Sequence, residues 1–193
     1  MDNSERGSCS RGNGNSAARQ IEIFQGDITR VVADAIVNAA NSSLSVGGGV
    51  DGAIHRAAGP NLEKECAEIG GCPPGEVRLT HGWNLPAKYV IQTVGPRWNG
   101  GNSGEAETLE NCYFRSMELA AQNGIRSIAF PAISTGIYGY PKEEAVKVAV
   151  RGVLKACELW SEPSRIIFVV WHDDEMRALY EAELRDCPFF RKS

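Results

Sequence analysis

The sequence lacks the features that mark several large classes of protein. None of its apolar runs approaches the roughly 18 residues that a membrane-spanning helix needs, so we expect no membrane partner. The N-terminus has no charged start followed by an apolar stretch, so we expect no secretory signal. Basic residues number 20 against 24 acidic ones and form no cluster, so we expect no nucleic-acid partner.

The sequence also lacks paired cysteines and several motifs of nucleotide and hydrolase sites. Its six cysteines form neither a C-x-x-C pair nor a Cys/His zinc spacing, so we interpret them as reduced thiols and expect a cytoplasmic location. No G-x-x-x-x-G-K-[ST] loop, G-x-S-x-G elbow or H-E-x-x-H motif occurs. These absences argue against P-loop NTPases, serine hydrolases of the α/β type and zinc peptidases.

The composition predicts one domain that follows an N-terminal tail. Residues 1–19 contain ten Gly, Ser or Asn and almost no apolar side chain, so they cannot offset the entropy cost of becoming ordered. We therefore expect a flexible tail over residues 1–19 and a single domain over residues 20–193, a length that suits one folded unit.

Short apolar runs alternate with helical patterns along the rest of the chain, which is typical of a layered α/β domain with a mixed, mainly parallel sheet. The run at 166–170 is apolar without alternation, as in a central strand that helices cover on both faces. Amphipathic spacing and stop signals predict the helices. We expect strands at 21–24, 35–37, 77–80, 89–94, 127–130 and 165–170, and helices at 50–58, 105–122, 142–159 and 173–184.

Three predicted strands run into small, polar or glycine-rich segments. These segments are 26–29, 38–52 and 134–139. In α/β sheets, ligands bind beyond the strand ends, and glycine lets backbone N–H groups approach a phosphate closely. Two glycine loops in one domain therefore favour a diphosphate held from both sides, although a single glycine run is also typical of an ordinary turn.

Five short segments occur in the order GDIT, NAAN, GGGVDGAIH, VGP and ISTGIYGYP. Together they resemble the macrodomain family, specifically its MacroD-like class of ADP-ribosyl hydrolases. The resemblance implies an α/β fold, a three-layer α/β/α sandwich with a mixed, mainly parallel central sheet, so that residues 20–193 would form a single macrodomain. It also implies that ADP-ribose binds in a cleft above the strand ends.

The resemblance implies a hydrolase with two substrates and no cofactor. It would remove mono-ADP-ribose from acidic side chains of ADP-ribosylated proteins, and it would deacetylate O-acetyl-ADP-ribose. A reader module that binds ADP-ribose without cleaving it is the alternative. An RNA or poly(ADP-ribose) binder is a third interpretation, which the acidic net charge disfavours.

The resemblance also implies roles for individual residues. Asp27 would accept a hydrogen bond from the adenine amino group, beside the backbone of Ile28. Asn41 and Asp51 match the pair that acts on the distal ribose and the attacking water. The residues expected to line the diphosphate and distal ribose are Gly48, Gly49 and Val50 on one side and Ser134, Thr135, Gly136, Ile137 and Tyr138 on the other.

Side-chain chemistry gives separate reasons for the Asn41 and Asp51 pair. An amide can orient ribose hydroxyls without adding charge beside a diphosphate. A carboxylate is a weak base at neutral pH, so we expect Asp51 to position water more than to deprotonate it, with a substrate phosphate sharing the proton. The alternatives are a helix N-terminal acid for Asp51 and a turn residue for Asn41.

His55 lies four residues after Asp51, so the two side chains share a helix face. We interpret His55 as support for the catalytic carboxylate. The alternative is a metal ligand, but His81 and His172 lie in unrelated segments and complete no ligand set, so we expect no metal.

Three further segments leave alternatives open. Gln92 stands where a histidine is usual in the MacroD-like class, and we expect it to affect strand packing but not activity. The segment from Cys66 to Pro74 is short and unusual for the class, which leaves substrate preference open. An aromatic residue at Trp171-His172 either stacks on adenine or packs at the strand end.

Overall fold

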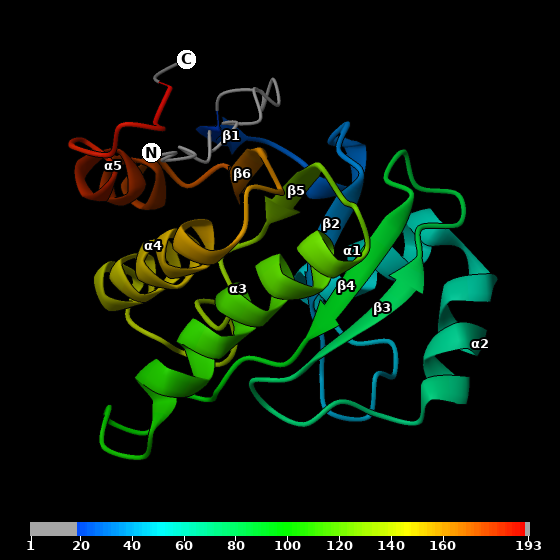
Figure 1. Cartoon of the computed structure of the whole chain (residues 1–193). Coiled ribbons are helices and arrows are strands. Elements are labelled where there is room, and N and C mark those ends of the chain that lie inside the picture. Colours follow the sequence, from blue (N-terminus) through cyan, green and yellow to red (C-terminus); the bar gives the residue numbers. More distant parts are fainter. Residues whose placement is uncertain (1–18, 192–193) are drawn as a thin grey trace, which may run out of the picture.

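A computed structural model of the chain describes residues 19–191. The tail expected over residues 1–19 therefore lies, apart from Arg19, outside the described residues, and the domain boundaries expected at 20 and 193 stay a prediction. Across the described range, helices pack on both faces of one sheet (Figure 1).

The sheet has six strands within the described range, in the order β1-β6-β5-β2-β4-β3. Every neighbouring pair is parallel except β3 and β4, which are antiparallel, so the predicted mixed and mainly parallel sheet is confirmed. The strands are β1 (Gln20–Gln25), β2 (Ala35–Ala39), β3 (Val77–His81), β4 (Tyr89–Thr93), β5 (Ser127–Phe130) and β6 (Arg165–Val170).

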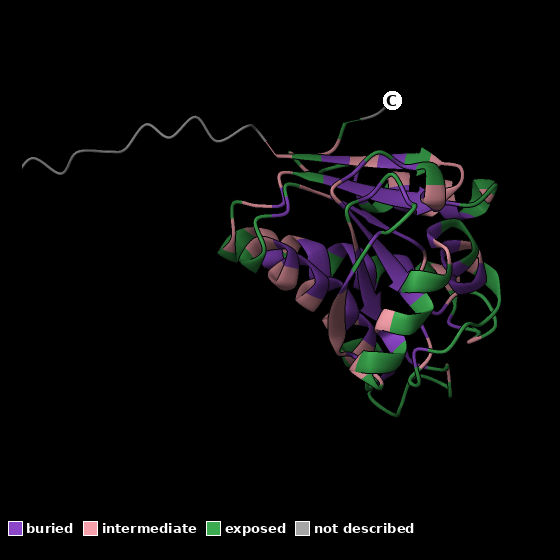
Figure 2. Cartoon of the chain, turned by 90° about the vertical axis from the view of Figure 1, so that its right-hand side faces the viewer, coloured by how far each residue is buried: buried purple, intermediate pink, exposed green. Residues whose placement is uncertain are grey.

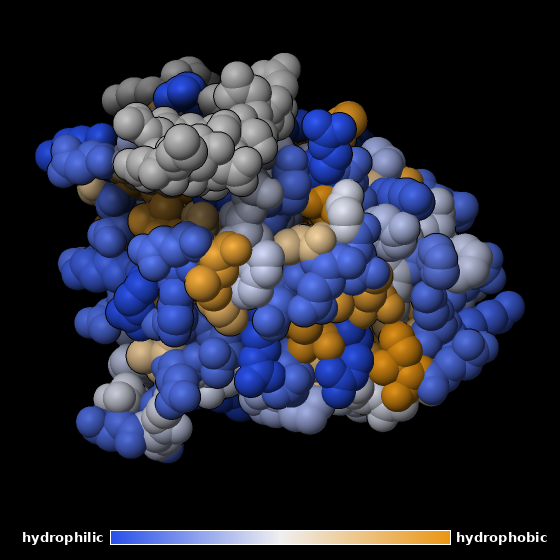
Figure 3. Space-filling view, viewed as in Figure 1, coloured by the Kyte–Doolittle hydropathy of each residue, from blue (hydrophilic) through white to orange (hydrophobic). Residues whose placement is uncertain are grey.

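The helices form the two outer layers of the sandwich. Helices α1 (Gly49–Ala58) and α2 (Pro60–Ile69) cover one face of the sheet. Helices α3 (Glu105–Gln122), α4 (Lys142–Leu159) and α5 (Asp174–Glu183) cover the other face. Figure 2 shows the strands as a largely buried layer, and the face seen in Figure 3 is mainly hydrophilic with scattered small groups of apolar residues. The predicted three-layer architecture is confirmed.

Strand β6 shows why its sequence has no polar alternation. Ile166 and Phe168 enter the core beneath α3, α4 and α5, whereas Ile167 and Val169 enter the core beneath α1 and α2. All four side chains are at most 5% exposed. A strand covered by helices on both faces must be apolar at every position, as the sequence predicts.

Helix α2 is an element that the sequence analysis missed. The Gly59-Pro60 pair predicts the end of α1, and α1 does end there. Proline also suits the first position of a new helix, because the N–H that it lacks would have no partner there. Leu62 and Cys66 are buried on the inner side of α2, and the first residues of the unusual segment 66–74 belong to this helix.

The five cysteines within the described residues are free thiols, as predicted. Burial raises the pKa of Cys66, Cys112 and Cys157 to about 11. These thiols therefore stay protonated and unreactive at neutral pH. In residues 19–191, no helix is long and apolar enough to cross a membrane.

The packing of β6 predicts a large loss of stability when its central aromatic side chain is removed. Phe168 is 0% exposed and stacks on Tyr180 with ring centroids 4.6 Å apart. Phe168→Ala should lower the free energy of unfolding by about 3–5 kcal/mol, measured by chemical denaturation. Leu159→Ala is the control, because this side chain is 63% exposed, and it should change stability by less than about 0.5 kcal/mol. Equal effects of the two substitutions would contradict the described core.

Candidate active site

A cleft of about 870 Å³ opens at the carboxyl ends of the parallel strands. Strands β1, β6, β5, β2 and β4 all run in the same direction, so the segments that follow them meet at one edge of the sheet. All but one of the site residues expected from the sequence line this cleft. They are Asp27, Ile28, Asn41, Gly48, Gly49, Val50, Asp51, Ser134, Thr135, Gly136, Ile137 and Tyr138, and His55 is the exception.

Asp27 lines the cleft, and its two carboxylate oxygens have different contacts. Its Oδ1 caps a short 3₁₀ helix (Ile28–Arg30) by accepting hydrogen bonds from the backbone N–H of Thr29 (2.9 Å) and from its hydroxyl (2.7 Å). Its Oδ2 lies 3.9 Å from Nε of Arg30, and the side chain is 33% exposed. One oxygen of a well-anchored carboxylate is thus available to a ligand.

Asp51 lies in the first turn of α1 and is almost entirely buried, at 4% exposure. Its Oδ2 accepts a hydrogen bond from the backbone N–H of Gly47 (2.5 Å), and its Oδ1 accepts one from Nδ2 of Asn38 (2.6 Å). Asp51 is therefore an acidic residue at the N-terminus of a helix, which was the alternative interpretation of this position. Its two side-chain hydrogen bonds also fix the carboxylate at the wall of the cleft.

Asn41 organises the loop that follows β2. Its Oδ1 accepts hydrogen bonds from the Ser43 hydroxyl (2.8 Å) and the Ser45 N–H (3.2 Å), and its Nδ2 donates to the Ser45 carbonyl (2.6 Å). The side chain is therefore a turn residue and also lines the cleft. A Cβ built on Gly47 would lie 3.4 Å from Nδ2 of Asn41 and 3.0 Å from Oδ2 of Asp51. The Asn41 amide and the Asp51 carboxylate therefore both lie next to Gly47.

His55 lies beside Asp51 and does not line the cleft. Its Nε2 lies 3.6 Å from Oδ1 of Asp51, and the residue is 6% exposed. The shared helix face is confirmed. Within residues 19–191, no three His, Cys, Asp or Glu side chains are grouped closely enough to hold a metal ion.

The second glycine loop forms the opposite wall. Ser134 has a left-handed φ of 66°, and its buried hydroxyl has no hydrogen-bond partner among the described residues. Gly136 has no left-handed φ, so its backbone conformation does not require a glycine. A Cβ on Gly136 would meet no atom within 4 Å, so a side chain there would enter open space beside the cleft.

The rim of the cleft carries apolar and aromatic side chains. Ile137 is 92% exposed and Trp171 is 65% exposed, and both line the opening. Trp171 is therefore placed to stack on a flat ligand, whereas His172 is outside the lining. The guanidinium of Arg97 lies 4.5 Å from the centre of the Tyr138 ring. The sequence analysis missed Arg97, because an isolated arginine after a strand carries no recognisable signal.

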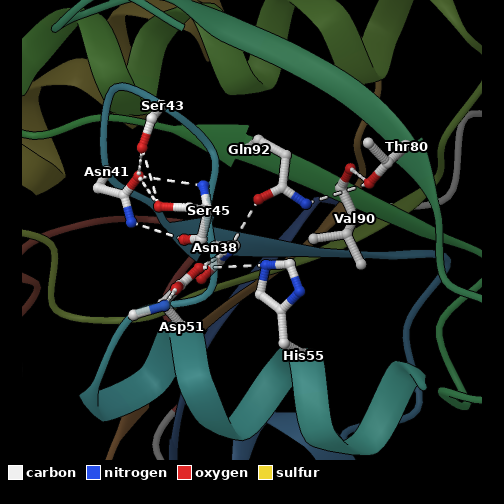
Figure 4. A network of polar contacts seen from close by, with 10 residues as sticks. Asn38, Asn41, Ser43, Ser45, Asp51, His55, Thr80, Val90 and Gln92 are labelled. Carbon is white, nitrogen blue, oxygen red and sulfur yellow. Dashed lines mark hydrogen bonds and ion pairs between the residues drawn. The ribbon is translucent and has the colours of Figure 1, made fainter. Parts of the chain in front are cut away.

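A buried polar network behind Asp51 was also missed (Figure 4). Asn38 donates to Asp51 and, over 2.8 Å, to Oε1 of Gln92. Nε2 of Gln92 donates to the hydroxyl of Thr80 (3.1 Å). Gln92 was expected only to affect strand packing, but it is connected to Asp51 through one intervening side chain. Polar residues within otherwise apolar strand segments were the sequence signal that could have revealed this network.

The comparisons with known proteins agree with this fold. The family model described as Macro domain matches residues 37–149. A Macro domain-containing protein from Methanosarcina mazei is 52% identical over 163 residues, covering 84% of this chain and 87% of that protein. A protein from Klebsiella pneumoniae named O-acetyl-ADP-ribose deacetylase is 53% identical over 175 residues, covering 89% of this chain and 99% of that protein.

Two sets of solved structures are similar as well. The Oceanobacillus iheyensis macrodomain with ADP is 42% identical with a TM-score of 0.78, covering 84% of this chain and 88% of that one. The Trypanosoma brucei macrodomain in complex with ADP-ribose is 43% identical with a TM-score of 0.78, covering 84% and 68%. With the sandwich fold, the cleft at the strand ends and these matches together, the chain belongs to the macrodomain family.

Proposed function

We propose that this chain binds ADP-ribose in the cleft and hydrolyses the acetyl ester of O-acetyl-ADP-ribose. The observation that carries the proposal is the buried Asp51 carboxylate, held in one orientation at the wall of a cleft between two glycine loops. Similar proteins named O-acetyl-ADP-ribose deacetylase, and a similar macrodomain in complex with ADP-ribose, support the choice of ligand.

The strand order supports a direction for the ligand. Asp27 follows β1, Ser134 follows β5, and Asn41 follows β2. Because β1 and β2 are three strand spacings apart, these groups spread over roughly 14 Å along the cleft. An extended ligand would place adenine near Asp27, the diphosphate near Ser134 and the distal ribose near Asn41 and Asp51.

The middle of the cleft suits a diphosphate. Helix α1 begins at Gly49, and its N-terminal end carries a partial positive charge beside the first glycine loop. A phosphate oxygen could accept a hydrogen bond from the buried Ser134 hydroxyl, which would satisfy this group. Arg56 and Arg97 also line the cleft and add positive charge to it.

The chemistry at the distal ribose is ester hydrolysis. A water held by Asp51 attacks the acetyl carbon, the bond between that carbon and the ribose oxygen breaks, and the ribose oxygen takes up a proton. The products are acetate and ADP-ribose. Each oxygen of Asp51 already accepts a hydrogen bond from an N–H group, so the carboxylate is held in one orientation. We propose that this fixed carboxylate orients the attacking water.

The same arrangement suits a second class of substrate. Mono-ADP-ribose on an aspartate or glutamate side chain is also an ester of the distal ribose, so one site can cleave both bonds. We propose ADP-ribosylated proteins as further substrates on this ground. The free thiols fit a reducing compartment, so we propose a cytoplasmic location. We also propose that residues 20–193 act as a single macrodomain.

The proposed adenine contact predicts the effect of an isosteric change at Asp27. Asp27→Asn keeps an oxygen that can cap the 3₁₀ turn, but its amide can no longer present two acceptor oxygens. Loss of a charged hydrogen bond should weaken ADP-ribose binding by about 1.5–3 kcal/mol, measured by calorimetry. Asp186→Asn, at an exposed residue outside the cleft, should bind like wild type. Unchanged affinity of Asp27→Asn would remove Asp27 as the base reader.

The open space at Gly136 predicts that a substitution there can prevent ADP-ribose binding without disturbing the fold. Gly136→Glu adds a charged side chain beside the proposed diphosphate, at a position without steric conflict or left-handed φ. It should abolish ADP-ribose binding and leave the circular dichroism spectrum unchanged. Gly136→Ala is the size control and should retain most of the affinity. A Gly136→Glu protein that unfolds would show a structural role for this residue and contradict the prediction.

The proposed mechanism predicts substitutions that lower the rate of turnover but leave the affinity for ADP-ribose nearly unchanged. Asp51→Ala should lower the rate of acetate release from O-acetyl-ADP-ribose about 10²- to 10⁴-fold, because the water loses its orienting group. Asn41→Ala should act in the same direction, and the double variant should lose less than the product of the single losses. ADP-ribose affinity should stay within a few-fold of wild type in both single variants.

The outcomes of this experiment distinguish the enzyme from the reader. Wild-type turnover in Asp51→Ala would refute the role of the carboxylate. A wild-type protein that binds ADP-ribose but releases neither acetate nor protein-linked ADP-ribose would favour the reader module.

A further inference from the structure

A chain of hydrogen bonds runs from Asp51 across the sheet to the edge strand β3, and its residues come from β2, β4 and β3 (Figure 4). Asn38, Gln92 and Thr80 are each at most 1% exposed. The hydroxyl of Thr80 donates to the carbonyl of Val90 over 3.0 Å, and this contact ends the chain. Asn38 and Gln92 are register partners on neighbouring parallel strands, so the sheet itself brings their amides together.

The two ends of this chain fix the direction of every hydrogen bond. A backbone carbonyl only accepts, so the Thr80 hydrogen goes to Val90, and Thr80 must accept from Nε2 of Gln92. Gln92 therefore presents its Oε1 to Asn38. Both hydrogens of the Asn38 amide are then committed, one to Gln92 and one to Oδ1 of Asp51.

The Asn38 amide has one orientation for the same reason. Exchanging its oxygen and nitrogen would set the oxygen against the Asp51 carboxylate and against the Gln92 oxygen. The Asn38 oxygen has no hydrogen-bond partner among the described residues, so it is the two donated bonds that hold the amide in place. The Asn38 amide, which lies in the protein interior, therefore donates an N–H group to Oδ1 of Asp51.

We propose that Asn38 and Gln92 are positioning residues, which act through the Asp51 carboxylate and keep its orientation toward the cleft. The inference rests on the proposed hydrolase function. Neither residue lines the cleft, so neither touches the ligand. Asn38 holds Oδ1 from the sheet and the Gly47 N–H holds Oδ2 from the loop, which stops rotation of the carboxylate about its last bond. Asp51 itself lines the cleft, so the carboxylate that these two bonds hold is at the ligand site of the proposal.

Four substitutions test this proposal in the full chain. Asn38→Leu removes the donor to Asp51, Gln92→Leu removes the group that orients Asn38, and Thr80→Val removes the end of the chain. Thr93→Val is the matched control. Thr80 and Thr93 are both buried, and each hydroxyl donates to a backbone carbonyl, but Thr93 donates to Glu76 and is outside the chain.

Kinetics with O-acetyl-ADP-ribose should show a selective loss of kcat. We expect kcat to fall about 10- to 100-fold in Asn38→Leu and less in Gln92→Leu and Thr80→Val, with KM and the Kd for ADP-ribose close to wild type. Thr93→Val should keep the wild-type kcat. In an Asp51→Ala background, Asn38→Leu should cause little further loss, because both changes act through one carboxylate.

Several results would overturn the proposal. These are unchanged kcat in the three chain variants, an equal loss in Thr93→Val, or losses that multiply fully in the Asp51→Ala background. If Asn38→Leu does not fold, the comparison of Thr80→Val with Thr93→Val carries the test.

A crystal structure of Gln92→Leu separates this inference from the proposed function. If wild type releases no acetate, the hydrolase proposal fails, and the orientation of Asp51 in Gln92→Leu still decides the positioning role. A rotated Asp51 carboxylate supports that role, and an unchanged one refutes it.

Discussion

The parallel direction of five neighbouring strands is the constraint on which the rest of this structure depends. Parallel strands need long connections, and the helices that supply them cover both faces of the sheet. The same direction brings the loops after β1, β6, β5, β2 and β4 to one edge. A binding cleft at that edge follows from the topology, and the strand order sets the sequence of chemical groups along it.

The two faces of the sheet are not equivalent in their chemistry. On the face beneath α3, α4 and α5, Val37 of β2 and Ile91 of β4 are buried in an apolar cluster. The opposite face carries Asn38 and Gln92 among apolar neighbours, directly behind the helix that bears Asp51. Burying amides is costly unless they are hydrogen-bonded, so their presence there is best explained by what they hold in place.

Most of the sheet and the two longest helices could be predicted from periodicity, because buried strands and amphipathic helices leave direct patterns in the sequence. The glycine segments also predicted which loops line the cleft. Helix α2 could not be predicted with the same signals, because Pro60 ends one helix and begins the next. The contact between Asn38 and Gln92 depends on the register of β2 against β4, which a single sequence does not contain. The contact of Arg97 with Tyr138 likewise depends on two loops that meet only in space.

A crystal structure of the chain with ADP-ribose would test the central claim most directly. The account predicts adenine beside Oδ2 of Asp27, the diphosphate between the loops at 47–49 and 134–138, and the distal ribose beside Asn41 and Asp51. It also predicts that the Asp51 carboxylate keeps its hydrogen bonds to Asn38 and Gly47 when the ligand is bound. A ligand in the reverse direction, or a distal ribose away from Asp51, would contradict it.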